Sequence, residues 1–167
     1  MSASIAVVDD EARMVEIVSM LLRRDGHEVR GFTDPEAFLA SLEREPVDLL
    51  LTDLRMPRMD GVEVLRRARA ELPGLPVILF TAHATVQTAI EAMKEGAYDY
   101  LQKPFDNDEM KALVRRALEH SRLARENRLL RRGGADVVAE SDAMKRVMAL
   151  LRRVAPSRST VLITGES

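Results

Sequence analysis

The chain has 167 residues, of which 46% are hydrophobic and 31% charged, so it can bury a sizeable core and wholesale disorder is excluded. It contains no cysteine, which excludes disulfides, iron–sulfur clusters and thiolate zinc sites, and its net charge of −2 is too small to indicate a nucleic-acid or membrane partner. No apolar run is long enough to span a bilayer, and the first residues lack the basic and apolar parts of a secretory signal, so we expect a cytoplasmic protein.

Five short runs rich in Val, Ile and Leu alternate along the chain with stretches of helical spacing. The runs are Ile5–Val8, Glu28–Phe32, Leu49–Thr52, Val77–Thr81 and Tyr98–Leu101. The apolar stripes of the helical stretches lie within Met14–Leu22, Phe38–Leu42, Val62–Leu72, Val86–Met93 and Met110–Ala117. This alternation predicts an α/β fold whose parallel sheet is covered by helices on both faces, with right-handed crossovers. Five such units favour a doubly wound, flavodoxin-like sheet of strand order 2-1-3-4-5 over a closed eight-unit barrel.

Polar side chains stand at the end of four predicted strands. Asp9 and Asp10 follow the first strand and Asp53 follows the third. Thr81 ends the fourth strand, and Lys103 comes shortly after the fifth. Because the carboxyl ends of parallel strands share one edge of the sheet, we expect these side chains to lie close together.

Three carboxylates at one edge repel one another unless a cation joins them. Oxygen ligands without His or Cys favour Mg²⁺ or Mn²⁺ over zinc, and Mg²⁺ keeps coordination positions open for phosphate oxygens. The lysine adds a second positive charge and the threonine adds a hydroxyl donor. The set is typical of a site that holds a phosphoryl group against a carboxylate nucleophile.

Each of these residues taken alone also has a structural interpretation. Asp10 could be the cap of the helix that follows, Thr81 a routine turn residue and Lys103 a solvated side chain. Asp53 is a less natural cap because a loop separates it from the next helix. The joint pattern, in the right strand order, favours the functional interpretation.

The residues from about Ile5 to His120 resemble the receiver domain of two-component response regulators, which has a CheY-like fold. The resemblance rests on the segments Val7–Glu11, Leu51–Pro57, Asp60-Gly61, Phe80–Ala82 and Tyr100–Phe105. It implies that Asp53 is the phospho-acceptor and that a sensor histidine kinase is the partner that phosphorylates it.

The same resemblance implies roles for the neighbouring residues. Mg²⁺ or Mn²⁺ would be bound by Asp10, by Asp53 and by the main-chain carbonyl of Arg55, with Asp9 acting largely through water. A further set would act on the phosphoryl group or respond to it. This set comprises Lys103, Thr81 and Ala82 at the phosphoryl oxygens, and Tyr100 as an aromatic switch whose ring turns inward when Thr81 moves.

Two other functions share part of this chemistry. A Mg²⁺-dependent phosphatase of the haloacid-dehalogenase type would also use an aspartyl nucleophile, but it places a general-acid carboxylate two residues later, where this chain has Arg55. A receiver-like interaction module without phosphotransfer is the third reading, and the intact set of Asp10, Asp53, Thr81 and Lys103 counts against it. We therefore expect no enzymatic activity beyond self-phosphorylation from small donors and autodephosphorylation.

The composition changes after the fifth helical stretch. Residues 1–120 carry 15 basic and 22 acidic side chains, whereas residues 121–167 carry 10 and 5. The fifth helix is predicted to run on through Leu130 to Gly133-Gly134, followed by a helical segment around Met144–Val154 and a strand over Thr160–Thr164. We therefore expect a receiver domain over 1–120, a helical linker over 121–135 and a further fragment over 136–167.

The C-terminal fragment resembles the entry to the AAA+ ATPase domain of nitrogen-regulatory-type activators of sigma-54 RNA polymerase. The resemblance rests on Val138–Met144, Val154–Pro156 and Val161–Ser167. It implies control of sigma-54-dependent transcription, with polymerase and DNA contacted only through other domains. Because the chain ends before the lysine of the phosphate-binding loop, we expect it neither to bind nor to hydrolyse ATP.

The linker helix carries a short heptad pattern. Leu113, Leu123, Asn127 and Leu130 fall at a and d positions, which predicts a coiled-coil seam and a homodimer. The alternative is a solvated helix whose leucines cover a neighbouring domain. The arginines of this helix are interpreted as a solvated face, because no recognition motif for DNA accompanies them.

Overall fold

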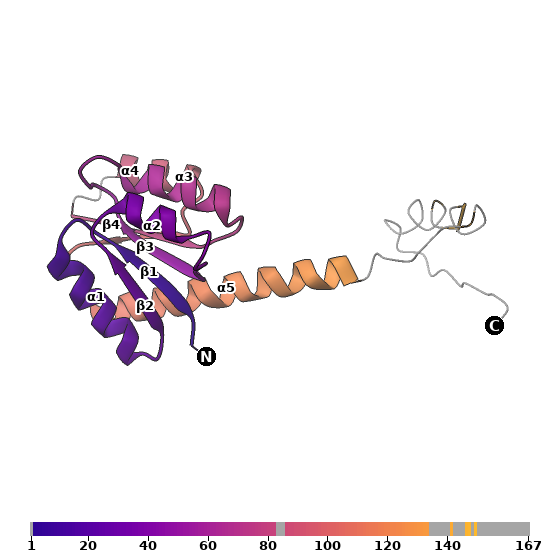
Figure 1. The fold of residues 1–167 in the computed structure, drawn as a ribbon, viewed down its shortest axis with the longest axis horizontal. Coiled ribbons are helices and arrows are strands. Elements are labelled where there is room, and N and C mark those ends of the chain that lie inside the picture. Colours follow the sequence, from indigo (N-terminus) through magenta and orange to yellow (C-terminus); the bar gives the residue numbers. More distant parts are fainter. Residues whose placement is uncertain (1, 83–85, 134–140, 142–145, 148, 150–167) are drawn as a thin grey trace. The chain divides into compact units, whose positions relative to one another are not determined.

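The computed structural model describes residues 2–82, 86–133, 141, 146–147 and 149, and these fall into two compact units, Met1–Glu126 and Asn127–Ser167 (Figure 1). The side chains of 86, 88, 125 and 127–133 are outside the description. The predicted strand at Thr160–Thr164, and most of the helical segment predicted around Met144–Val154, lie outside the described residues.

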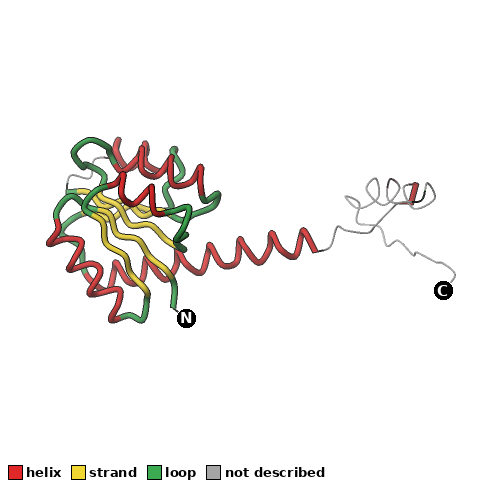
Figure 2. Tube along the Cα trace, in the orientation of Figure 1, coloured by secondary structure: helices red, strands yellow, loops and turns green. Residues whose placement is uncertain are grey.

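The first unit alternates strands with helices, as predicted (Figure 2). The strands are β1 (Ser4–Val8), β2 (Glu28–Phe32), β3 (Leu49–Asp53), β4 (Val77–Thr81) and β5 (Asp99–Gln102). The helices are α1 (Ala12–Arg24), α2 (Pro35–Ser41), α3 (Gly61–Glu71), α4 (Val86–Lys94) and α5 (Asn107–Gly133). All paired strands are parallel and their order is β2-β1-β3-β4-β5, which confirms the predicted doubly wound sheet.

The sheet separates two apolar layers because side chains alternate between its faces. Along β1, Ala6 and Val8 belong to one core cluster, whereas Ile5 and Val7 belong to the other. The first cluster is completed by buried residues of α2, α3 and α4, and the second by buried residues of α1 and α5 (Figure 1). Both faces of the central strands are therefore dry, and the sheet can meet water only at its ends and edges.

The helix ends are fixed by local chemistry that also shapes the connecting loops. Asp34 and Asp60 cap α2 and α3 by accepting hydrogen bonds from the amides of Glu36 and Glu63. At the C-terminus of α1, Gly26 has a φ of +92°, a conformation that an L side chain rarely adopts. These ends hold the sheet-to-helix connections in defined geometries.

The fifth strand begins at Asp99 rather than at the predicted Tyr98. The amide of Tyr98 still donates to the carbonyl of Val77 at 2.8 Å, so the difference lies at the strand margin. The ring of Tyr98 faces His120 of α5, with the two centroids 5.6 Å apart. An aromatic contact thus joins the start of β5 to α5.

One residue of the predicted dimer seam, Leu113, is buried in the core of the first unit. Leu113 is 3% exposed and belongs to the core cluster beneath α1 and α5, so its side chain is not available to a seam. Leu123 is 51% exposed, as a seam residue must be. The backbones of Asn127 and Leu130 lie in α5, but their side chains are outside the described part of the chain. Among the described residues, no helix is both long and apolar enough to cross a membrane.

Candidate functional site

Three predicted site residues converge where the strands end. Val8 of β1 pairs with Thr52 of β3, which places Asp9 and Asp53 at the same level of the sheet. Thr81 pairs with Gln102, so Lys103 follows directly at the same edge. Parallel strand order alone therefore brings together residues that are tens of positions apart in the sequence.

The centre of the site is the ammonium group of Lys103, which two carboxylates share. Its Nζ lies 2.6 Å from Oδ2 of Asp9 and 2.6 Å from Oδ1 of Asp53. Asp9 is completely buried and Asp53 is 7% exposed. The shared cation attracts both carboxylates and so offsets part of the cost of burying them, and charge-assisted hydrogen bonds of this length are strong.

The remaining carboxylate oxygens are held by main-chain amides. Oδ1 of Asp9 accepts from the amide of Glu11 at 2.9 Å, and Oδ2 of Asp53 accepts from the amide of Arg55 at 2.7 Å. Each carboxylate therefore has one oxygen on Lys103 and the other on the loop that follows its own strand. This arrangement fixes both carboxylates with one shared side chain, that of Lys103, and two main-chain amides.

Lys103 is itself positioned by β4 and its neighbours. Its amide donates to the carbonyl of Thr81 at 2.7 Å, and its Nζ lies 6.0 Å from the ring centroid of Phe80. Phe105 stacks on Phe80 with centroids 5.2 Å apart, and the bond between Lys103 and Pro104 is cis. The contribution of Phe80 was not predicted, because an aromatic residue in a buried strand carries no signal beyond core packing.

Gly61 was also missed as a positioning residue. A Cβ at this position would lie 2.2 Å from the carbonyl oxygen of Asp53 and 3.0 Å from Cα of Leu54, and both atoms belong to the backbone. The amide of Gly61 donates to the carbonyl of Leu54 at 2.9 Å. The first residue of α3 thus rests directly on the backbone of Asp53, which only glycine allows. The Asp60-Gly61 pair in the sequence was the available signal.

Burial and pairing act in opposite directions on the two titrating partners. Burial raises the pKa of the Asp9 carboxyl, and the hydrogen bonds from Lys103 and from the amide of Glu11 offset this only in part. Burial alone would lower the pKa of Lys103, but the hydrogen bonds to Asp53 and Asp9 outweigh it, so that this pKa is raised. The lysine is therefore held firmly in its charged form.

The other predicted residues differ in their exposure. Thr81 is buried, whereas Asp10, Arg55 and Ala82 are exposed, and Tyr100 is 38% exposed. The N-cap of α1 is Glu11, so the interpretation of Asp10 as the helix cap is not supported. Asp10 is thus free to face a ligand that arrives from solvent.

The donors present suit a hard cation that binds together with phosphate. Among the described residues, no three His, Cys, Asp or Glu side chains form a ready metal cage. Mg²⁺ does not need one, because it usually takes one or two carboxylates and completes its shell with water and phosphate oxygens. Asp9, Asp10 and Asp53 supply carboxylate oxygens at one edge of the sheet, and oxygen is the donor type that such an ion prefers.

Comparison with known proteins adds independent information. Residues 5–115 match the family model of the response regulator receiver domain. Over 166 residues the chain is 39% identical to the DNA-binding transcriptional regulator NtrC of Proteus hauseri, and this alignment covers 96% of the chain and 35% of that protein. The chain thus spans about a third of the length of the curated relatives that it matches.

Solved structures agree with these matches. The crystal structure of NtrX from Brucella abortus in complex with ATP aligns with a TM-score of 0.75 at 36% identity, covering 95% of this chain and 36% of that one. The crystal structure of the receiver domain of NtrX from Brucella abortus aligns with a TM-score of 0.66 at 35% identity, covering 69% of this chain and 98% of that one.

The shared lysine predicts a pH-dependent loss of stability in the variant Lys103→Met. Removing one partner from a buried ion pair costs about 3–5 kcal/mol at pH 7, because Asp9 and Asp53 are left without a counter-charge. The pKa of Asp9, already raised, should rise further. A carboxyl whose folded pKa exceeds its unfolded value of 3.8 loses stability as pH rises between the two values, so the loss should be smaller at pH 5 than at pH 7.

Urea unfolding at the two pH values measures this difference. The control is Lys94→Met on the exposed side of α4, which should change the free energy of unfolding little at either pH. A loss in Lys103→Met that is the same at pH 5 and pH 7 would contradict the role assigned to the Asp9 carboxyl.

Proposed function

The chain belongs to the response regulator receiver domain family, and on that premise we propose that it accepts a phosphoryl group on Asp53 from a sensor histidine kinase. One observation carries this proposal: the Nζ of Lys103 lies 2.6 Å from both Asp53 and the buried Asp9. Asp53 is 7% exposed, so its carboxylate is largely buried but still reaches solvent. Because the carboxylate is also fixed beside a cation, it is pre-oriented as a nucleophile.

The transfer itself would use an oxygen of the Asp53 carboxylate. This oxygen attacks the phosphorus of a phosphohistidine, the new P–O bond forms as the P–N bond breaks, and the imidazole nitrogen keeps the electron pair. The ammonium of Lys103, which contacts the carboxylate before transfer, would contact the negatively charged phosphoryl oxygens after it. We assign the hydroxyl of Thr81 and the main chain of Ala82 to the same oxygens, since both stand at the end of β4.

A divalent cation is part of this proposal. Receiver domains generally bind Mg²⁺, and Asp10, Asp53 and the main-chain carbonyl of Arg55 would hold it, with Asp9 acting largely through water. The ion would supply positive charge that offsets the phosphoryl oxygens. Mn²⁺ has the same preference for oxygen ligands and would replace it.

The response to phosphorylation would lie on the face formed by α4, β5 and α5. When Thr81 turns toward the phosphoryl group, it would vacate space for the ring of Tyr100. Tyr100, Ile90 and Met93 are 38%, 43% and 46% exposed, so this face carries large apolar side chains that a change of conformation can cover or present. We propose a shift of population between two arrangements of this face.

The role in transcription is inferred from the relatives. NtrC of Proteus hauseri is described as a DNA-binding transcriptional regulator, and this chain matches 35% of it. We propose that the receiver controls sigma-54-dependent transcription through an ATPase domain beyond this chain. We further propose that the continuation of α5 past Leu123 pairs two copies of the chain.

The variant Asp53→Asn tests the acceptor. With acetyl phosphate and Mg²⁺, the unaltered chain should gain one phosphoryl group by intact-mass spectrometry, and Asp53→Asn should gain none because an amide is not a nucleophile here. Asp25→Asn, at the opposite end of α1, should be labelled like the unaltered chain. Full labelling of Asp53→Asn would contradict the assignment of Asp53 as the acceptor. Steady turnover of a generic phosphomonoester by the unaltered chain would favour the phosphatase alternative instead.

The variant Asp10→Asn tests the proposed metal ligand. Removing one of three neighbouring negative charges should weaken Mg²⁺ binding in isothermal titration, yet raise the melting temperature of the metal-free protein by about 2 °C. Glu16→Gln, which removes an exposed charge on the same helix, should leave Mg²⁺ binding unchanged. A marked fall in the melting temperature of Asp10→Asn would assign this residue a structural role.

The double variant Leu123→Lys, Leu130→Lys tests the dimer. Lysine at a and d positions should abolish a coiled-coil seam and give monomers by light scattering, while phosphorylation of Asp53 is retained. The matched control is Ser121→Lys with Arg128→Lys on the b positions of the same helix, which should stay dimeric. If the leucine variant stays dimeric as well, the contact lies on the receiver face rather than on the linker helix.

A further inference from the structure

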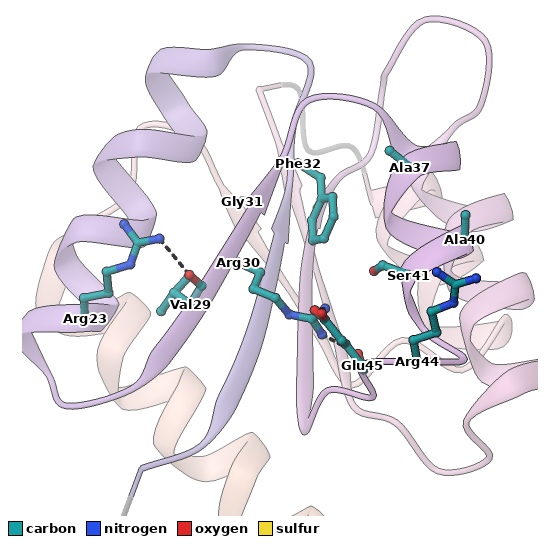
Figure 3. Close-up of a pocket in the computed structure, with 10 residues that line it drawn as sticks. All are labelled: Arg23, Val29, Arg30, Gly31, Phe32, Ala37, Ala40, Ser41, Arg44 and Glu45. Carbon is teal, nitrogen blue, oxygen red and sulfur yellow. Dashed lines mark hydrogen bonds and ion pairs between the residues drawn. The ribbon is translucent and has the colours of Figure 1, made fainter.

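A groove of about 630 Å³ runs along the free edge of β2, between α1 and α2, and none of Asp9, Asp53 and Lys103 lines it (Figure 3). β2 is the first strand in the sheet order and pairs only with β1, so its other side has no partner strand in the described sheet. An open strand edge of this kind is a template for a further strand.

The backbone of β2 shows which groups face the groove. The amide of Glu28 donates to Ala3, and the carbonyl of Phe32 accepts from Asp9, so even-numbered residues of β2 direct their amides and carbonyls toward β1. Val29 and Gly31 therefore direct theirs outward. The carbonyl of Val29 is met by Nη2 of Arg23 at 2.7 Å, which confirms this direction (Figure 3).

Gly31 adds no side chain of its own to this edge. This residue is exposed, and a Cβ would lie 2.3 Å from Cγ1 of Val15, so a side chain is excluded on the α1 side. On the α2 side the lining residues include Ala37 and Ala40, which are exposed and small. A second backbone can therefore approach Gly31 closely.

The groove is strongly basic. Arg23, Arg30 and Arg44 line it, and Glu45 is its single acidic lining residue. Arg30 pairs with the carboxylate and the main-chain carbonyl of Glu45. The guanidinium of Arg44 is exposed and has no hydrogen-bond or ion-pair partner among the described residues. The groove thus carries three guanidinium groups against one carboxylate, and of the three only that of Arg44 has no partner among the described residues.

We propose that this groove binds an extended acidic peptide segment of a partner protein, added as a strand beside β2. Arg23 comes from α1 and Arg44 follows α2, and these helices cover opposite faces of the sheet. Successive residues of a strand point to opposite faces, so two adjacent acidic residues reach both arginines at once, which a compact anion cannot do. A second copy of this chain does not fit, because two β2 edges would bring arginine against arginine.

The test uses the full chain and a fluorescein-labelled peptide made of two repeats of Glu-Asp-Val-Thr. Binding is followed by fluorescence anisotropy, and the Gly31 amide by hydrogen exchange. The unaltered chain should bind and its Gly31 amide should become protected, because the added strand accepts that N–H. Arg44→Glu should weaken binding at least about tenfold, since it replaces attraction by repulsion in the groove.

Arg24→Glu is the matched control, because Arg24 is exposed on α1 but does not line the groove. It makes the same change of net charge and should weaken binding far less than Arg44→Glu. The same repeats with Gln and Asn in place of Glu and Asp should bind at least about tenfold more weakly. Equal losses in the two variants, or binding without protection of Gly31, would overturn the proposal. Inorganic phosphate or pyrophosphate protecting Gly31 as well as the peptide does would assign the groove to a small anion instead.

Discussion

The site depends on one cation shared by two carboxylates. Asp9 has no contact with solvent and Asp53 has little, and Lys103 is the cation that both carboxylates contact. The same contact joins the ends of β1 and β3 to the segment after β5, which are not adjacent in the sequence. The same three side chains therefore stabilise the fold and orient the Asp53 carboxylate. Any change in the charge of Asp53 alters the electrostatic interactions of Lys103.

The fold and the main site residues could be predicted from the sequence because both follow from periodicity. Five apolar runs separated by helical stripes leave few topologies, and in a parallel sheet the residues after each strand must share one edge. The sequence alone therefore predicts that Asp9, Asp53 and Lys103 lie close together. The structure adds the distances, and it shows that Asp10 stays exposed beside this centre.

Other features depend on tertiary contacts that no short pattern encodes. Leu113 matches a heptad position, but it also lies on the face of α5 that covers the sheet, and its side chain is buried in the core. In the sequence Phe80 has the pattern of an ordinary core residue, and only the fold shows that its ring lies near Lys103. The basic groove could not be predicted either, because it needs β2 to be an edge strand and needs Arg23 and Arg44 to be brought to it by different helices.

The contact between Gly61 and the backbone of Asp53 makes the site mechanically uneven. On the side of α3 there is not even room for a methyl group at Gly61, so the backbone of Asp53 is tightly packed there. The carboxylate of Asp53 is held instead by polar contacts, the ammonium of Lys103 and the amide of Arg55, which can exchange partners without breaking the core. If a group were added to Asp53, the backbone of this residue could therefore not shift toward α3. The displacement would have to be taken up by the side chain of Lys103 and by the loop that carries Arg55.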